Sequence, residues 1–222
     1  RRQFMSTILD GPRLAPASGG AAKQLVVFAH GYGANGNDII ALGQQWAELL
    51  PHAAFVSPNA PQDCPNTPTG YQWFPIDQHS MAEIVTGVAV AAPFLENFIN
   101  AELDRLQLEP SALALVGFSQ GTMIALHAGV RRKVAPAAIV GYSGALAAAD
   151  TLSRNIVVRP PVLLVHGDRD EVIPIAALDV ARRGLTAAGV DVQCYVSKGI
   201  GHGISPEGLA LGGVFLKNNF ST

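Results

Sequence analysis

The sequence LALVGFSQG, residues 113–121, joins a run of apolar residues to a Gly-x-Ser-x-Gly motif. The apolar run predicts a buried strand over Leu113–Val116, and the residues that follow predict a helix over Gln120–Arg131. The turn between them is so tight that only glycine fits two positions before and after the serine. Such a turn holds the hydroxyl of Ser119 above the sheet as a candidate nucleophile. The alternative is a glycine-rich turn in which Ser119 only caps the helix.

Further apolar runs alternate with helical patterns along the chain. This alternation predicts an α/β fold with a mostly parallel sheet and helices on both faces. The other predicted strands are Leu25–Ala29, Ala53–Val56, Ala137–Val140, Val162–Val165 and Val192–Val196. The other predicted helices are Asp38–Leu50, Met81–Leu106, Ile175–Ala188 and Glu207–Asn218.

Two segments allow more than one structure. Pro93 predicts that the helix containing it either kinks there or begins near it, because proline removes a helix hydrogen bond. Thr7–Leu14 is a candidate antiparallel hairpin at the sheet edge. No repeat or linker divides the chain, so we expect one domain over residues 1–222. Met5 is a candidate native start, in which case residues 1–4 are an addition.

The composition argues against several function classes. Charged residues make up 14% and the net charge is −2, which is not typical of a nucleic-acid binder or an electrostatic membrane anchor. Ser111–Val130 carries no charge, but its Gly-x-Ser-x-Gly motif indicates a strand, a turn and a helix rather than a membrane span. Cys64 and Cys194 are expected to be free thiols. With no signal-peptide pattern at the start, we expect a cytoplasmic protein.

A nucleophilic serine requires a base and a third group that orients this base. His202 is the candidate base because it lies in a glycine-bracketed loop after the last predicted strand. His127 lies on the same predicted helix as the serine, about 12 Å along its axis, which is too far. His30 and His166 end strands directly before glycines, a position typical of residues that fix loops.

The acid is expected between the serine and the histidine in the chain, as in other proteins with this elbow. The loop after Val162–Val165 offers Asp168, Asp170 and Glu171. Glu171 has a longer and looser side chain, and Asp168 could pair with Arg169 or turn the loop. Spacing alone leaves both aspartates open.

The first central strand ends in HGYG, residues 30–33. Acyl transfer develops negative charge on an oxygen, and a fixed N–H donor at that point contributes about 3–4 kcal/mol. We expect the N–H groups of Tyr32 and Gln120 to be these donors. The loop also matches the Gly-x-Gly-x-x-Gly pattern of dinucleotide-binding proteins. No acidic residue stands at a strand end about twenty positions later, so we reject this interpretation.

Together these motifs resemble the phospholipase/carboxylesterase family of α/β hydrolases, whose relatives include acyl-protein thioesterases. The resemblance extends from about Leu25 to the final helix. Its specific marks are His30-Gly31-Tyr32-Gly33, Gly117-Phe118-Ser119-Gln120-Gly121, His166-Gly167-x-x-Asp170 with Pro174, Gly201-His202 and a Trp73-Phe74 pair. It implies an α/β-hydrolase fold, and because the chain has no long insertion that could form a lid, we expect no large lid domain. It also implies Asp170 as the acid, and Tyr32 and Gln120 as the oxyanion donors.

Two positions depart from the family pattern. Thr122 follows the elbow where the family often has a second glycine, which crowds the start of the helix. The segment Gln72–Asp77 lacks the family's usual Trp-aromatic-Asp order. Neither departure touches the predicted triad, and both bear on substrate preference.

We therefore predict a serine carboxylesterase that hydrolyses short-to-medium acyl esters through an acyl-Ser119 intermediate. The alternatives are an acyl-protein thioesterase or lysophospholipase on the same triad, and a non-catalytic binding protein on this scaffold. We expect no metal, organic cofactor, nucleic acid or membrane insertion, and a homodimer is left open. The apolar residues that could line an acyl groove, or equally belong to the core, are Tyr71, Trp73, Phe74 and Ile76.

Overall fold

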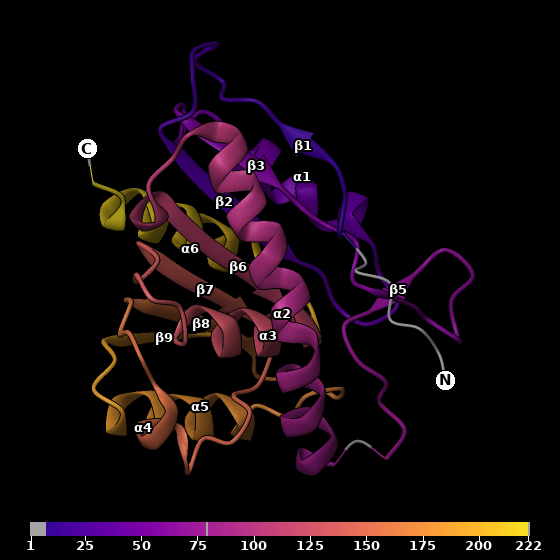
Figure 1. The fold of residues 1–222 in the computed structure, drawn as a ribbon. Helices are drawn as coiled ribbons and strands as arrows, with labels where there is room; N and C mark the ends of the chain where they lie inside the picture. The colour runs from indigo at the N-terminus through magenta and orange to yellow at the C-terminus, as the bar shows by residue number, and fades with distance from the viewer. Residues whose placement is uncertain (1–7, 79, 222) are drawn as a thin grey trace.

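A seven-stranded sheet forms the centre of the protein, as Figure 1 shows in a computed structural model that describes residues 8–78 and 80–221. The strand order is β1-β3-β2-β6-β7-β8-β9, and all neighbours are parallel except β1 with β3. This arrangement confirms the predicted mostly parallel α/β sheet. Its strands are β1 (Arg13–Leu14), β2 (Gln24–Ala29), β3 (Ala53–Val56), β6 (Leu113–Phe118), β7 (Ala138–Tyr142), β8 (Val162–Gly167) and β9 (Val192–Ser197).

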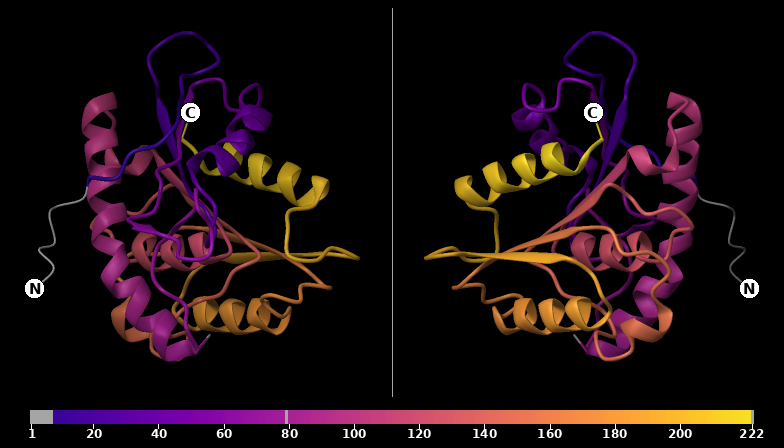
Figure 2. Two further views of the ribbon diagram at one scale, coloured as in Figure 1. Left: turned by 90° about the vertical axis from the view of Figure 1, so that its right-hand side faces the viewer. Right: turned by 90° about the vertical axis from the view of Figure 1, so that its left-hand side faces the viewer.

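Helices cover both faces of this sheet (Figure 2). On one face lie α2, α3 and α5, and on the other lie α1 and α6. The short helix α4 and the 3-10 turn η1 lie in connections between these elements. The bounds are α1 (Gly36–Trp46), α2 (Met81–Leu106), η1 (Pro110–Ala112), α3 (Gln120–Gly129), α4 (Leu152–Asn155), α5 (Ala176–Ala187) and α6 (Pro206–Asn219).

The two helical layers explain why the central strands are apolar without interruption. Successive side chains of a strand point to opposite faces, so a strand with helices on both sides buries every residue. In β2, Leu25 and Val27 pack in the core under α2 and α3, whereas Val26 and Phe28 pack in the core under α1 and α6. All of these side chains are at most 1% exposed.

Helix α2 continues through Pro93 and does not begin near it. The proline is exposed, and buried residues on both sides of it, including Val88, Ala91 and Leu95, hold the helix against the core. This packing offsets the backbone hydrogen bond that the proline removes. Ser80 begins the helix with a capping box that involves Glu83.

The N-terminal edge of the sheet differs from the predicted hairpin over Thr7–Leu14. Within the described part of that segment only β1 is a strand, and it pairs antiparallel with β3, so no hairpin forms there. Thr7 lies outside the described residues. A hairpin needs two paired strands, and here the neighbouring strand β3 supplies the partner instead. The small sheet formed by β4 (Gln62–Asp63) and β5 (Tyr71–Gln72) was not predicted.

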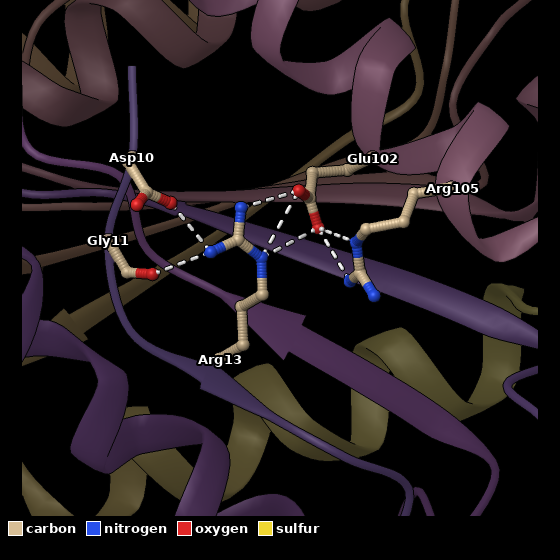
Figure 3. A network of polar contacts seen from close by, with 5 residues as sticks. All are labelled: Asp10, Gly11, Arg13, Glu102 and Arg105. Carbon is tan, nitrogen blue, oxygen red and sulfur yellow. Dashed lines mark hydrogen bonds and ion pairs between the residues drawn. The ribbon is translucent and has the colours of Figure 1, made fainter. Parts of the chain in front are cut away.

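A buried carboxylate attaches the N-terminal segment to α2 (Figure 3). Glu102 accepts hydrogen bonds from the guanidinium groups of Arg13 and Arg105, the shortest at 2.6 and 2.7 Å. Arg13 also contacts Asp10 and the carbonyl oxygen of Gly11. Charge-assisted hydrogen bonds of this kind are stronger than neutral ones, so the network fixes β1 at the sheet edge.

Among the helices of the described residues, α2 alone is long and apolar enough, by length and composition, to cross a membrane. Its buried face belongs to the core, where it packs on α3. The uncharged segment Ser111–Val130, by contrast, forms β6 and α3. Cys64 and Cys194 are both free thiols, as predicted.

Candidate active site

The predicted elbow lies between β6 and α3. Ser119 caps α3 with φ 55° and ψ −119°, a conformation that non-glycine residues rarely adopt. A side chain at Gly121 would collide with the carbonyl oxygen of Ala29, and one at Gly117 would collide with the carbonyl oxygen of Gly121. The two glycines are therefore a steric requirement of the turn. The strained serine stands at the carboxyl end of β6, where ligands gather in such sheets.

A chain of hydrogen bonds links Ser119 to His202 and Asp170. The serine Oγ lies 3.0 Å from His202 Nε2, and His202 Nδ1 lies 2.7 Å from Asp170 Oδ2. An ionised carboxylate only accepts, so the imidazole proton lies on Nδ1 and Nε2 is free to accept the serine proton. The arrangement can thus deprotonate the hydroxyl as its oxygen attacks a carbonyl carbon.

Asp170 is held as an ionised acceptor. Burial by itself raises the pKa of this carboxyl, but the contact with His202 and the N–H donors of Ile173 and Val172 outweigh burial and lower the pKa. Oδ1 accepts from the two N–H groups at 2.8 and 2.9 Å, which leaves Oδ2 for the imidazole. The carboxylate is therefore charged and fixed in orientation before any substrate binds.

The rival acid, Asp168, contacts the histidine loop at a different point. Its Oδ1 accepts the N–H of Gly199 at 2.6 Å, and its own N–H donates to Ser197. Gly167 permits this close crossing, because a side chain there would collide with the carbonyl oxygens of Ile200 and Gly201. Asp168 thus holds the backbone of the loop that carries the histidine, and it makes no hydrogen bond to the imidazole itself.

His30 fixes the loop opposite the nucleophile. Its Nδ1 donates to the carbonyl oxygen of Gly31 at 2.7 Å, and its Nε2 accepts from the N–H of Ala60 at 2.9 Å. Only the neutral ring satisfies both bonds, and burial correspondingly lowers the pKa of His30. Gly31 lies against Phe118 and Ser119, so this loop approaches the serine closely.

The two expected oxyanion donors have free N–H groups. Within residues 8–78 and 80–221, the N–H groups of Tyr32 and Gln120 donate to no other protein atom. Gln120 is the first residue of α3, where an N–H group has no partner inside the helix and the helix dipole favours an anion. Both N–H groups are therefore available to a developing oxyanion.

The side chain of Gln120 has a second role that the sequence did not indicate. Its Oε1 accepts the N–H of Trp73 at 2.8 Å, and its Nε2 donates to the carbonyl oxygen of Phe74 at 2.9 Å. The indole of Trp73 donates in turn to the carbonyl oxygen of His30 at 3.0 Å. One amide therefore joins the elbow, the Trp73-Phe74 segment and the oxyanion loop.

The four apolar candidates for an acyl groove divide into two pairs. Trp73 and Phe74 are 1% and 2% exposed and belong to the core, which was the second of the two interpretations. Tyr71 and Ile76 are half-buried on the edge of that core. The backbone of Tyr71 bonds to Gly33 and Ala34, which places Tyr71 beside the oxyanion loop.

Sequence reasoning also missed three serines that support the histidine loop. Ser143 donates its hydroxyl to the carbonyl oxygen of Gly203 at 2.8 Å, and Ser197 shares a 2.8 Å hydrogen bond with Ser205. The position of Ser143 after a strand end is the one signal that could have suggested it, since active-site residues follow the strands of such sheets. In the part of the chain that the structure describes, no group of three metal-ligating side chains is present.

Comparison with known proteins extends the geometric result. A family model described as Phospholipase/Carboxylesterase matches residues 15–219. The chain is 28% identical to acyl-protein thioesterase 1 of Gibberella zeae, over 90% of this chain and 94% of that protein. It is 27% identical to esterase YpfH of Escherichia coli, over 82% of this chain and 77% of that protein. The crystal structure of esterase PE8 superposes with a TM-score of 0.92 at 41% identity, over 96% of this chain and 100% of that one.

Proposed function

The chain belongs to the phospholipase/carboxylesterase family, and from this premise we propose a serine carboxylesterase that hydrolyses short-to-medium acyl esters through an acyl-Ser119 intermediate. Esterase or thioesterase activity follows from the family and its relatives. The observation that carries the more specific proposal is the hydrogen-bonded chain Ser119–His202–Asp170, with bonds of 3.0 and 2.7 Å. Two free N–H groups beside the serine complete the chemistry that acyl transfer requires.

In the first half of the reaction, Ser119 Oγ attacks the carbonyl carbon of the ester while its proton moves to Nε2 of His202. The ester C=O bond becomes a C–O⁻ bond, and the N–H groups of Tyr32 and Gln120 stabilise this oxygen. Asp170 stabilises the imidazolium ion through Nδ1–H without accepting its proton. Collapse of the tetrahedral intermediate expels the alcohol, which takes the proton from Nε2, and leaves the acyl group on Ser119.

In the second half, water attacks the acyl-enzyme carbonyl and gives one proton to His202 Nε2. The same N–H groups stabilise the new oxyanion. Its collapse releases the carboxylic acid and returns the proton to Ser119 Oγ. Each half-reaction thus starts from neutral His202 and restores it, so one imidazole serves as base and then as acid.

Preference for short-to-medium acyl chains is supported by the apolar residues around the site. Trp73 and Phe74 are buried in the core, so they offer no exposed surface to a long acyl chain. The half-buried residues Tyr71, beside the oxyanion loop, Ile173, beside Asp170, and Phe118, whose ring centre lies 5.0 Å from that of His202, form a modest apolar surface, with Ile76 further along the same segment as Tyr71. The hydrocarbon of a bound ester therefore has limited area to cover, and each added methylene gains only about 0.8 kcal/mol where it is buried.

A chain-length series of p-nitrophenyl esters, from acetate to palmitate, tests the substrate proposal. We expect kcat/KM to be highest for acyl chains of about four to eight carbons. Each methylene that is buried adds binding free energy, whereas a methylene that stays in water adds none. An acyl-peptide thioester and a lysophospholipid, assayed in parallel, represent the rival substrates. Preference for either over every simple ester would reject the carboxylesterase proposal while retaining the triad.

The nucleophile is tested separately with a fluorescent organophosphonate. Wild-type protein should become labelled, and Ser119→Ala should neither label nor hydrolyse any ester. Ser153→Ala is the matched control, because Ser153 is an exposed serine on the short helix α4. Labelling that persists in Ser119→Ala would move the nucleophile to another residue. Folded wild-type protein that neither labels nor hydrolyses esters would favour a non-catalytic binding protein.

A further inference from the structure

A groove of about 660 Å³ lies between α2 and the end of α3, and it contains no residue of the proposed triad. One wall is the α2 surface that includes Ala92 and Pro93, and the other is formed by His127 and the segment 131–134. Its volume is within the range typical of sites for small organic ligands, about 300–1,000 Å³. His127 stands about 12 Å along α3 from the level of Ser119, so the groove is separate from the ester site.

The charges along this groove are unbalanced. Three consecutive cations, Arg131, Arg132 and Lys133, line it together with one carboxylate, Glu96. Glu96 pairs with Arg132 at 2.7 Å, which neutralises the arginine that is most deeply buried. Among the described residues, neither Arg131 nor Lys133 has a carboxylate within 4.0 Å. Two positive charges therefore remain without a partner.

Arg131 is the better placed of these two cations. It is half-buried at the groove, whereas Lys133 is exposed to solvent. Burial lowers the pKa of Arg131, which means that its charge is partly desolvated without compensation. Its side chain makes one hydrogen bond to a described residue, from Nη1 to the carbonyl oxygen of His127. A guanidinium has five N–H donors, so most of them remain available to a ligand.

Apart from the exposed Lys133 and the Glu96–Arg132 ion pair, the groove residues around Arg131 are apolar or neutral. Burial and the charge of Arg131 lower the pKa of His127 to about 4, so the imidazole is uncharged near neutral pH. Ala92, Pro93, Ala128 and Val134 supply hydrocarbon surface beside it. The groove thus combines one accessible guanidinium with an extended apolar lining. This combination matches a ligand that has one anionic group and a hydrocarbon body.

We propose that this groove binds an amphipathic carboxylate, with the carboxylate on the guanidinium of Arg131 and the hydrocarbon along Ala92, Pro93, Ala128 and Val134. Arginine presents two parallel N–H donors that fit a carboxylate in a bidentate contact. A single half-buried guanidinium suits a monoanion, because a dianion would require a second desolvated cation. The carboxylate also restores a partner to a charge that the fold leaves uncompensated.

Binding is tested with sodium octanoate and protein that carries ¹³C-labelled alanine methyl groups. We expect the methyl resonances of Ala92 and Ala128 to shift in a saturable manner. Ala29, whose carbonyl lies against the elbow, reports separately on octanoate in the ester site. Octan-1-ol and inorganic phosphate are the matched probes that lack the charge and the hydrocarbon. Each should bind at the groove about tenfold or more weakly than octanoate, since a charge-assisted hydrogen bond or the apolar contact is lost.

Two variants assign the contact. Arg131→Gln should lower the affinity for octanoate, as reported by the methyl groups of Ala92 and Ala128, by about tenfold or more. Arg154→Gln, which removes an exposed arginine from α4, should leave it unchanged. Ala89→Trp obstructs the groove from the exposed side of α2 and should abolish the shifts even if Arg131→Gln perturbs local structure. Ester hydrolysis should be retained in all three variants.

Three results would overturn the proposal. The first is the absence of saturable shifts at Ala92 and Ala128 up to millimolar octanoate. The second is equal affinity for octanoate and for either octan-1-ol or phosphate, since the ligand would then not be an amphipathic anion. The third is unchanged octanoate binding in either Arg131→Gln or Ala89→Trp. All three are independent of whether the protein hydrolyses esters.

Discussion

His166 Nε2 lies 3.4 Å from Asp170 Oδ2, the same oxygen that contacts the imidazole of His202. The same nitrogen also lies 2.8 Å from the carbonyl oxygen of Ile173. Both neighbours are acceptors, so Nε2 carries a proton and donates it to Ile173. The ring is 2% exposed, and its hydrogen bond to Ile173 holds the turn that carries Asp170.

This contact makes His166 a positioning residue, and two substitutions test it. His166→Leu removes the donor and should lower kcat/KM by about 10- to 100-fold, because the Asp170 turn can shift by a fraction of an ångström. His166→Gln retains an N–H group near the position of Nε2 and should recover most of the loss. The reduction should fall on kcat rather than KM. Equal losses in both variants, or a loss confined to thermal stability, would contradict a positioning role.

The two aspartates of the same loop should differ strongly. Asp170→Asn should lower kcat by up to about 10⁴-fold, because an amide no longer holds the Nδ1–H tautomer of His202 or stabilises its positive charge. Asp168→Asn retains an oxygen that can accept the N–H of Gly199 and should cost no more than about tenfold. Steady-state kinetics on one good ester compares them. A larger loss of kcat in Asp168→Asn than in Asp170→Asn would show that Asp168 is the acid and that the assignment to Asp170 is wrong.

How far the sequence predicted this site depends on whether each contact is local or long-range. The elbow was predictable because Gly117, Ser119 and Gly121 obey a steric rule within five consecutive residues. The choice between Asp168 and Asp170 was not predictable from spacing. Asp170 and His202 are 32 positions apart, and spacing over such a distance cannot show which carboxylate faces the imidazole. Family resemblance favoured Asp170, and the structure places that carboxylate against His202.

The fold shows the same division. The alternation of strands and helices was predictable because burial on two faces imposes continuous apolar runs such as Leu25–Ala29. The path of α2 through Pro93 was not, since the core contacts that offset a missing hydrogen bond come from parts of the chain distant in sequence, chiefly α3. Trp73 and Phe74 illustrate a further limit. Aromatic side chains suit a core and an acyl groove equally well, and only their measured burial separates the two.

The amide of Gln120 should contribute to activity apart from the backbone N–H of the same residue. Gln120→Met keeps the length of the side chain but leaves the N–H of Trp73 and the carbonyl oxygen of Phe74 without partners. We expect the free energy of unfolding to fall by about 1–3 kcal/mol, the usual cost of an unpaired buried polar group. We also expect kcat/KM to fall about tenfold as the oxyanion loop loosens.

Gln45→Met is the control for that substitution, because Gln45 is exposed on the surface of α1. It should change neither kinetics nor stability. Denaturant unfolding and ester kinetics on the same samples separate the two effects. If Gln120→Met loses stability but keeps full kcat/KM at a temperature where it is folded, the amide supports only the core.

Glu102 should give the protein a defined acid-sensitive contribution to stability. Burial raises the pKa of this carboxyl, but hydrogen bonds and charge from Arg13 and Arg105 outweigh burial and lower the pKa below its ordinary value of 4.5. A carboxyl whose pKa is lower in the folded state stabilises that state above the unfolded pKa. The stabilisation is lost as the pH falls through the folded pKa, so it should be complete at pH 7 and decline below about pH 4.5.

Glu102→Gln should therefore lower the free energy of unfolding by about 2 kcal/mol at pH 7, the scale of a charge-assisted hydrogen bond. The difference between variant and wild type should narrow as the pH falls below 4.5, because wild type then loses the same charge. Urea unfolding from pH 7 to pH 3 measures both, with Glu109→Gln as the exposed control. A difference that stayed constant across this range would mean that the carboxylate charge does not stabilise the link between β1 and α2.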